Sequence, residues 1–481
     1  MKSTLSLLVF FFGFNPILYA QIDSLALKQL AIQLDTLQKS KLLSSGFLGF
    51  SLKVTSSNQS ILAVNEQKLL SPASTLKLIT TAYTMLELGP NFRYSTQLQA
   101  FGNIENQTLR SDLLVIGSGD PSLGSHRFEN VQDSFIDDWV FKIKLMGVSK
   151  IQGKIKIDHS IFEGNPTSAR WLWGDIGNYY GAGPMGFNFH ENFFTATIQG
   201  GNFVDKAAVI EKLTPKLSNV EVINNIKTDV ENSGDQVNIF SKPFDSQIVF
   251  TGYAPKNQTI NVKGTIPNVP QTFVDVFKEK LKAQQIEVLD SNIVLNPTQI
   301  FLIAENTSPP LSVLIEKCNF HSINLYAEAF LKTVASKSLK QVTLNDALIA
   351  EKQFWKTKGL NINEFKAKDG SGLSPQNFVS PAFMTDVLSV MSQYADFQLF
   401  KSSIPLIGVS GTVKNFAKNT KAVNKIYAKS GSIDGTRAYA GYFFAKSGQL
   451  LSFAIFINQY DASAGNLTKE LEKIMDLMAD L

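Results

Sequence analysis

One serine in this sequence is placed to act as a nucleophile beside a lysine. Ser74 and Lys77 form the chain's single Ser-x-x-Lys, and a helix is predicted to begin there, after the Ser-Pro-Ala of residues 71–73. The i, i+3 spacing puts the hydroxyl and the amine on one face of that helix. A serine hydroxyl needs a base within hydrogen-bond reach, and a lysine can serve if burial or a nearby cation lowers its pKa. The alternative is an accidental pair on a solvated helix.

A second lysine could supply that nearby cation. Lys-Ser-Gly occurs twice, beginning at Lys429 and at Lys446. The triplet at Lys446 lies between two apolar, strand-like runs, so we interpret it as a hairpin turn. The triplet of Lys429, Ser430 and Gly431 ends an alternating run, which places it on a strand, where a glycine lets a ligand backbone approach closely. We therefore predict that Lys429 is the functional lysine.

Ser322 and Asn324 form a third candidate group, a Ser-x-Asn at the start of a helix predicted over residues 322–336. A hydroxyl and an amide two positions apart can relay a proton and hold a substrate amide. The pattern is weak, because it recurs at residues 56–58. Ser322 could instead be the N-cap of the predicted helix.

In this chain order the three motifs resemble the SxxK, SxN and KTG set of penicillin-binding proteins and serine β-lactamases. The long gap from Ser74 to Ser322 is similar to that of the class C low-molecular-mass penicillin-binding proteins. This is the D-alanyl-D-alanine carboxypeptidase/endopeptidase family, peptidase S13, in which extra domains interrupt the catalytic one. The sequence departs from the family at Ile323, where Asp or Asn is usual, and at Ser430, where Thr is commoner.

Segments elsewhere in the chain, most of them glycine-rich, also resemble this family, so that the resemblance covers most of the mature chain. They are residues 117–123, 188–192, 369–374 and 408–412. By themselves the glycine-rich segments predict turns, and we assign them no chemistry.

The resemblance implies an acyl-enzyme mechanism. Ser74 would attack the carbonyl between two D-alanines while Lys77 takes its proton. The positive charge of Lys429 would keep Lys77 neutral. Ser322 would pass a proton to the leaving amine, and Asn324 would position the substrate amide.

The resemblance also implies how substrate is held. The oxyanion would lie between the backbone N–H groups of Ser74 and Ser432. Lys429 and Ser430 would hold the terminal carboxylate, next to Gly431. Water would then hydrolyse the acyl-enzyme, and no metal or cofactor is required.

The implied partners are peptidoglycan stem peptides and β-lactam antibiotics. Three alternatives stay open: a β-lactamase or esterase that uses the same groups, an inactive peptidoglycan-binding homologue, and a purely structural envelope protein. The balance between carboxypeptidase and endopeptidase action, the diamino acid of the stem peptide, the role of the inserted domains and the oligomeric state are also left open.

Composition supports this interpretation mainly by exclusion. The 481 residues are 44% hydrophobic and 18% charged, which is typical of a folded protein with more than one domain. A net charge of +4 without a dense basic block gives no reason to expect nucleic-acid binding. The single cysteine, Cys318, excludes an internal disulfide, and we expect it to be a buried packing residue. The four histidines show no metal-binding spacing.

The first twenty residues predict export. Lys2 precedes a mostly apolar run, Leu5 to Phe14, and Ala20 offers a small residue before a cut at Gln21. That run is shorter than the about 20 residues that a membrane-spanning helix needs. We therefore predict a signal peptide over residues 1–20 and a secreted, periplasmic protein without an integral membrane segment in its mature form.

The pattern of elements predicts an α/β (α+β) fold in which one split domain carries an insertion. The resemblance implies that the split domain is β-lactamase/transpeptidase-like, with an antiparallel sheet flanked by helices. This catalytic domain is split between residues 21–90 and 298–481. Residues 91–297 are predicted to be a β-rich insertion of two domains, 91–195 plus 256–297, with 196–255 nested inside. Helices of the catalytic domain are predicted near residues 23–39, 74–88, 322–336 and 344–358 and from 464, and its strands near 47–55, 61–64, 425–431, 436–445 and 449–457.

Overall fold

The computed structural model describes residues 22–128, 133–293, 300–461 and 464–481. The predicted signal peptide, residues 1–20, lies outside these ranges. Within them, no helix is both long enough and apolar enough to cross a membrane.

A five-stranded sheet lies at the centre of the part of the molecule that is predicted to be catalytic, and every neighbouring pair of its strands is antiparallel. Its strands in spatial order are β19 (Ile426–Ile433), β20 (Thr436–Phe444), β21 (Leu450–Asn458), β1 (Phe47–Val54) and β2 (Gln59–Val64). The two ends of the chain therefore build one sheet. The central strands β1 and β21 are buried almost throughout, as expected for strands covered on both faces.

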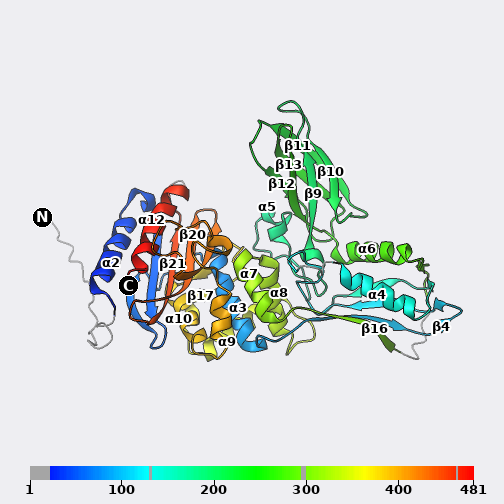
Figure 1. Ribbon diagram of the computed structural model, residues 1–481, viewed down its shortest axis with the longest axis horizontal. Helices are drawn as coiled ribbons and strands as arrows, with labels where there is room; N and C mark the ends of the chain where they lie inside the picture. The colour runs from blue at the N-terminus through cyan, green and yellow to red at the C-terminus, as the bar shows by residue number, and fades with distance from the viewer. Residues whose placement is uncertain (1–21, 129–132, 294–299, 462–463) are drawn as a thin grey trace.

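Helices cover both faces of this sheet (Figure 1). The terminal helices α2 (Ser24–Gln38) and α12 (Ala464–Met478) share a core with one face, because their apolar residues repeat at helical spacing. The other face packs against a second core, to which α3 (Leu76–Leu88), α8 (Asn324–Ala335) and α10 (Pro381–Met391) contribute. Further elements of this part are α7 (Leu311–His321), α9 (Leu344–Thr357), α11 (Phe397–Ser402), β17 (Phe365–Lys366) and β18 (Phe378–Val379).

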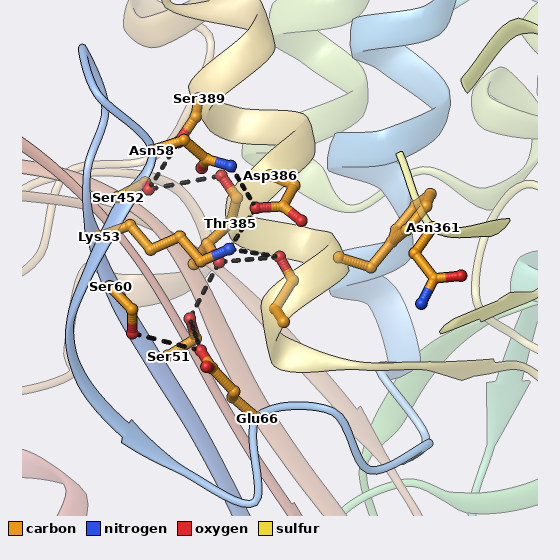
Figure 2. A network of polar contacts seen from close by, with 12 residues as sticks. Ser51, Lys53, Asn58, Ser60, Glu66, Asn361, Thr385, Asp386, Ser389 and Ser452 are labelled. Carbon is orange, nitrogen blue, oxygen red and sulfur yellow. Dashed lines mark hydrogen bonds and ion pairs between the residues drawn. The ribbon is translucent and has the colours of Figure 1, made fainter. Parts of the chain in front are cut away.

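A polar network lies between β1 and α10 (Figure 2). It is on the face of β1 opposite the core that β1 shares with α2. The buried Lys53 forms an ion pair with the partly exposed Asp386. Nearby, the Ser51 hydroxyl donates to Glu66 Oε2 at 2.9 Å and lies 3.0 Å from Thr385 Oγ1. Alternation along β1 explains this placement, because its polar side chains leave the strand on the side opposite its leucines.

The middle of the chain forms an inserted segment that extends away from the two termini (Figure 1). One sheet has the order β16 (Ile300–Thr307), β3 (Ser95–Phe101), β6 (Leu113–Ile116), β8 (Ile155–Asp158), and a second has β15 (Glu287–Val288), β7 (Lys150–Ile151), β5 (Thr108–Leu109), β4 (Ile104–Glu105). The other two have the orders β10 (Val209–Thr214), β9 (Phe193–Gln199), β14 (Thr259–Thr265) and β11 (Glu221–Asp229), β13 (Gln247–Pro255), β12 (Gln236–Phe240). Helices α4 (Ser134–Leu145), α5 (Trp173–Ile176) and α6 (Val269–Ala283) complete the segment.

The predicted α/β fold, a helix-flanked antiparallel sheet interrupted by a β-rich segment, is confirmed. One strand falls on an unexpected side of a predicted boundary. We assigned residues from 298 onward to the catalytic domain, yet β16 (Ile300–Thr307) pairs with β3 of the inserted segment. β3 lies about 200 residues earlier in the chain than β16. Local sequence patterns cannot predict which strands pair over such a separation. The division into domains itself stays a prediction.

Candidate active site

Ser74 and Lys77 lie side by side where a short helical turn enters α3. Ser74 belongs to a 3-10 turn, Ala73–Thr75, and the regular helix begins at Leu76, later than we predicted. The Lys77 ammonium donates to Ser74 Oγ at 3.1 Å. Ala73, just before the serine, has a φ of +44°, a left-handed conformation that is strained for a residue with a side chain. The predicted pairing of hydroxyl and amine on one side of the turn is thus present in the structure.

Lys77 is fully buried among neutral oxygen atoms. Besides Ser74, its ammonium donates to Asn324 Oδ1 at 2.6 Å and to the Ser371 carbonyl oxygen at 2.7 Å. Burial disfavours the charged form of an amine and lowers the pKa of Lys77 to about 8. We had expected the charge of Lys429 to keep Lys77 neutral, but burial is the main cause of this shift.

Two buried carboxylates lie near Lys77 and oppose this shift, because negative charge raises its pKa. Both are engaged by other donors. Glu328 Oε1 accepts hydrogen bonds from the N–H groups of Gly370 (3.0 Å) and Ser371 (2.8 Å). Asp369 also accepts backbone N–H groups of its own loop. In the described part of the chain, neither carboxylate forms an ion pair with Lys77.

The loop of residues 369–374 therefore takes part in the site, although we assigned it no chemistry from sequence. The loop contributes the carbonyl of Ser371, which accepts a hydrogen bond from Lys77. Because every residue type carries a backbone carbonyl, no sequence signal could have revealed this contact. Glu328 stands one helical turn after Asn324 on α8, and that i, i+4 spacing is a signal that could have been used.

Ser322 occupies the junction between α7 and α8. It is the C-cap of α7 with a φ of +57°, and α8 begins only at Asn324. The alternative that Ser322 is an N-cap, and the predicted helix start at residue 322, are therefore wrong. Its hydroxyl instead accepts a hydrogen bond from Lys429 Nζ at 2.9 Å. The left-handed conformation is uncommon for serine. It occurs here at a residue whose hydroxyl is held by the hydrogen bond from Lys429.

Lys429 lies on β19, the edge strand of the central sheet, as predicted. It is fully buried, and besides Ser322 it donates to the carbonyl of Ser430 at 2.7 Å. Burial and then the neighbouring Lys77 hold the pKa of Lys429 well below its usual value. The Ser430 hydroxyl lies 2.7 Å from that of Thr412. The triplet at Lys446 forms the turn between β20 and β21, so the predicted placement of one triplet on a strand and the other in a turn is confirmed.

Gly431 brings β19 against the turn that carries Ser74. A Cβ at this glycine would lie 2.6 Å from the carbonyl oxygen of Pro72 and 3.0 Å from the backbone nitrogen of Ser74. The absence of a side chain therefore allows the approach. Ser432, the next residue, is exposed, and its hydroxyl accepts a hydrogen bond from Arg437.

The structure thus places the predicted residues in two linked groups. Lys77 joins Ser74 to Asn324, and Lys429 joins Ser322 to the strand of Ser430, Gly431 and Ser432. The inserted segment takes part as well, because the Asn324 amide donates to the carbonyl of Tyr180 at 2.7 Å. A serine hydroxyl beside a buried amine of lowered pKa is the arrangement expected of a serine hydrolase with a lysine base.

The comparisons with known proteins agree with this class. The chain matches the D-Ala-D-Ala carboxypeptidase 3 (S13) family over residues 30–480. It therefore belongs to that family and is a serine-type peptidase.

Several curated relatives match over most of their length. D-alanyl-D-alanine carboxypeptidase DacB of Haemophilus influenzae is 25% identical over 440 residues, which is 90% of this chain and 89% of the relative. A D-alanyl-D-alanine carboxypeptidase of Actinomadura sp. is 22% identical, covering 94% of this chain and 85% of the relative. Penicillin-sensitive carboxypeptidase A of Dictyostelium discoideum is 26% identical, with 87% and 83% covered.

A solved structure confirms the fold. Penicillin binding protein 4 (dacB) from H. influenzae superposes with a TM-score of 0.80 at 23% identity, covering 95% of this chain and 99% of that one. A second structure of that protein, in complex with a novel β-lactam, has a TM-score of 0.74 at 22% identity.

Cys318 was predicted to be a packing residue, and the structure confirms that it is fully buried in α7. Its thiol contacts the carbonyl of Ile323 at 3.5 Å. Burial raises the pKa of this thiol to about 12, which keeps it protonated and a poor nucleophile.

Proposed function

We propose that this protein cleaves the D-Ala-D-Ala bond of peptidoglycan stem peptides through an acyl-enzyme on Ser74. The observation that carries the proposal is the contact between Ser74 and Lys77, a fully buried lysine whose hydrogen-bond acceptors are all neutral. A lysine with a pKa of about 8 is partly neutral near physiological pH and can accept a proton.

Acylation starts when the substrate carbonyl lies beside Ser74. The hydroxyl oxygen forms a bond to the carbonyl carbon, and its proton passes to Lys77 Nζ. The oxyanion is held by the N–H groups of Ser74 and Ser432, and the close approach at Gly431 supports this role by bringing β19 next to the serine. An oxyanion hole commonly contributes about 2.7–4 kcal/mol per donor.

Collapse of the tetrahedral intermediate breaks the C–N bond and releases D-alanine. Ser322 relays to the leaving amine the proton that Lys77 accepted from Ser74, supported by its hydrogen bond with Lys429, and Lys77 becomes neutral again. Asn324 positions the substrate amide. Water then attacks the ester carbonyl, and Ser74 regains its proton.

The substrate's terminal carboxylate binds Lys429 and Ser430. Burial disfavours charge on Lys429, and a bound carboxylate favours it. Binding of the substrate's carboxylate therefore stabilises the charged form of Lys429, next to the leaving group. A β-lactam carries a similar carboxylate beside a strained amide, so we propose that β-lactams acylate Ser74.

We further propose that the protein acts outside the cytoplasm. The apolar run after Lys2 and the small residue at Ala20 support export. Peptidoglycan, the substrate that the family implies, lies in the same compartment.

Intact-protein mass spectrometry with benzylpenicillin tests the proposal. We expect a stable adduct on the native protein and none on Ser74→Ala, whose circular dichroism spectrum should match the native one. Release of D-alanine from a pentapeptide should be lost in the same variant. An adduct on Ser74→Ala would contradict the assignment. No adduct with intact drug would indicate a peptidoglycan-binding homologue, and no adduct with hydrolysed drug a β-lactamase.

A further inference from the structure

A cavity of about 780 Å³ lies where α9 and β17 meet residues 168–170 of the inserted segment, and we call it the α9 cavity. Both α9 and β17 are labelled in Figure 1. Ser74, Lys77 and Lys429 are not among the described residues that line this cavity. It is therefore separate from the candidate active site.

The α9 cavity adjoins the loop of residues 369–374, which takes part in the candidate active site. Lys368, which lines the cavity, directly precedes this loop in the chain. Arg170 also lines the cavity, and its carbonyl accepts a hydrogen bond from Ser374 Oγ at 3.0 Å. A ligand in the α9 cavity therefore lies beside a loop that contributes to the active site.

The charged side chains among the described lining residues are all cations: Arg170, Lys352, Lys366 and Lys368. All four are exposed, and none of them forms an ion pair within the described part of the chain. Unpaired cations around one cavity repel each other, and anions that bind between them relieve this repulsion. The charge of the cavity therefore favours a ligand with several anionic groups.

Carboxylates that stand close to these cations in sequence are engaged elsewhere or uncharged. Glu364 accepts a hydrogen bond from Asn361 Nδ2 at 2.8 Å. Asp369 accepts the indole N–H of Trp171 at 2.9 Å. Burial raises the pKa of Glu351 to about 8, so that this carboxyl is mostly protonated near neutral pH. The protein's own acidic groups thus leave the cations available to a ligand.

Apolar side chains line the same cavity. Ile349 on α9 and Phe378 on β18 are 59% and 38% exposed, respectively. Leu344 and Leu348 lie one turn apart on the same face of α9 and are half-buried. Covering exposed apolar surface is favourable, so a matching ligand carries apolar groups beside its anionic ones.

We propose that the α9 cavity binds a second, uncleaved stem peptide of the peptidoglycan polymer, near the stem peptide that Ser74 cleaves. The proposal rests on the proposed function, because a substrate that repeats along a polymer brings further copies of the peptide close to the enzyme. A stem peptide combines alanine methyl groups with free carboxylates, which match the apolar and cationic residues of the cavity. Holding one peptide raises the effective concentration of its neighbours at Ser74.

The placement of the cations favours a peptide over a single phosphate headgroup. Arg170, Lys352 and Lys366 belong to three separate segments of the fold, namely residues 168–170, α9 and β17. Carboxylates spaced along a chain can contact cations on separate walls. A single phosphate instead contacts donors that converge on one point.

Binding of a fluorescent stem tripeptide, L-alanyl-γ-D-glutamyl-meso-diaminopimelate, tests the proposal by fluorescence anisotropy. The tripeptide lacks a D-Ala-D-Ala bond, and it is added to free protein and to protein acylated with benzylpenicillin, which fills the site at Ser74. We expect both forms to bind it. Lys352→Glu should weaken binding about threefold, and Lys352→Glu combined with Lys366→Glu about tenfold, as expected for exposed charge pairs. Lys356→Glu is the matched control, because Lys356 is exposed one turn further along α9 and does not line the cavity.

Cleavage assays separate the cavity from the catalytic site. D-Alanine release from a soluble pentapeptide should stay within about twofold of native in every variant, which also shows that the variants are folded. Release of D-alanine from peptidoglycan sacculi should fall about threefold in the double variant, because a second peptide is no longer held.

Three results would overturn the proposal: tripeptide binding that benzylpenicillin abolishes, equal tripeptide binding by native protein and the double variant, or an equal loss in Lys356→Glu and Lys352→Glu. Binding of phosphatidylglycerol vesicles through the same lysines, without tripeptide binding, would also overturn it and indicate a lipid site. A native protein that binds the tripeptide through these lysines, yet forms no benzylpenicillin adduct and releases no D-alanine, would refute the proposed function while supporting the peptide site.

Discussion

Lys53 and Lys77 are both buried lysines of the catalytic part, yet their partners differ. Lys53 forms an ion pair with Asp386 in the network between β1 and α10 (Figure 2). Among the described residues, Lys77 donates to a hydroxyl, an amide oxygen and a backbone carbonyl. A carboxylate partner favours the charged amine, whereas burial among neutral acceptors favours the neutral amine. Burial is the main cause of the lowered pKa of Lys77, and its three hydrogen-bond acceptors add no negative charge that would oppose this shift.

The fold keeps nearby carboxylates away from Lys77. Glu328 and Asp369 are both buried close enough to raise its pKa, but backbone N–H groups of the 369–374 loop take up their oxygens. That loop thus contributes twice: it holds the carboxylates, and it presents the Ser371 carbonyl to the ammonium. Burial raises the pKa of Glu328 to about 7, which further limits its negative charge.

The largest effect on the acylation rate is expected from removing the Lys77 amine beside Ser74. Lys77→Ala should fold but acylate with benzylpenicillin about 10³-fold more slowly than the native protein, since a positioned base contributes about 10²–10⁴-fold. The acylation rate is measured by time-resolved mass spectrometry. Lys53→Ala is the matched control, and its folded fraction should acylate at the native rate. Acylation of Lys77→Ala within tenfold of native would show that another group is the base.

A smaller effect on the acylation rate is expected from giving Lys77 a carboxylate partner, as Lys53 has. Asn324→Asp puts a carboxylate at an acceptor 2.6 Å from the Lys77 ammonium. The new charge should raise the pKa of Lys77 and slow acylation at pH 7 about tenfold, with the midpoint of the pH profile moved up by at least about one pH unit. Asn324→Ala removes the same amide without adding charge and should not move the midpoint upward. Equal midpoints in the two variants would contradict the role of acceptor charge.

The smallest effect on catalysis is expected from substitutions in the polar network between β1 and α10 (Figure 2). Lys53→Met leaves Asp386 without its cation and should lower the free energy of unfolding by about 3 kcal/mol, measured by urea denaturation. Combining it with Asp386→Leu should restore much of that loss. The acylation rate of folded protein should not change. A slower acylation rate in the folded variant would show that this network also supports the catalytic site.

Local patterns were enough to predict much of the fold and the site. The helical spacing of Leu467 and Leu471 and the alternation around Lys429 each depend on near neighbours, and both elements form as expected. The distinction between Lys429 and Lys446 likewise required only the sequence on either side. Pairing of Ser74 with Lys77 follows from their spacing alone.

Features set by distant parts of the chain could not be predicted in this way. The pairing of β16 with β3 and the bond from Asn324 to the carbonyl of Tyr180 join segments far apart in sequence. The predicted helix start at Ser322 is wrong because this residue has a left-handed conformation that its residue type rarely adopts. The main cause of the lowered pKa of Lys77, its complete burial, also depends on elements from both halves of the split domain.

The rate of benzylpenicillin acylation as a function of pH tests the central claim most directly. If Lys77 acts as a base in its neutral form, the rate should be low below its pKa, rise through about pH 8 and level off above. Stability at each pH is followed by circular dichroism, so that unfolding is not mistaken for loss of the base. A rate that is constant from about pH 6 to 10, or that falls as pH rises through 8, would contradict the account.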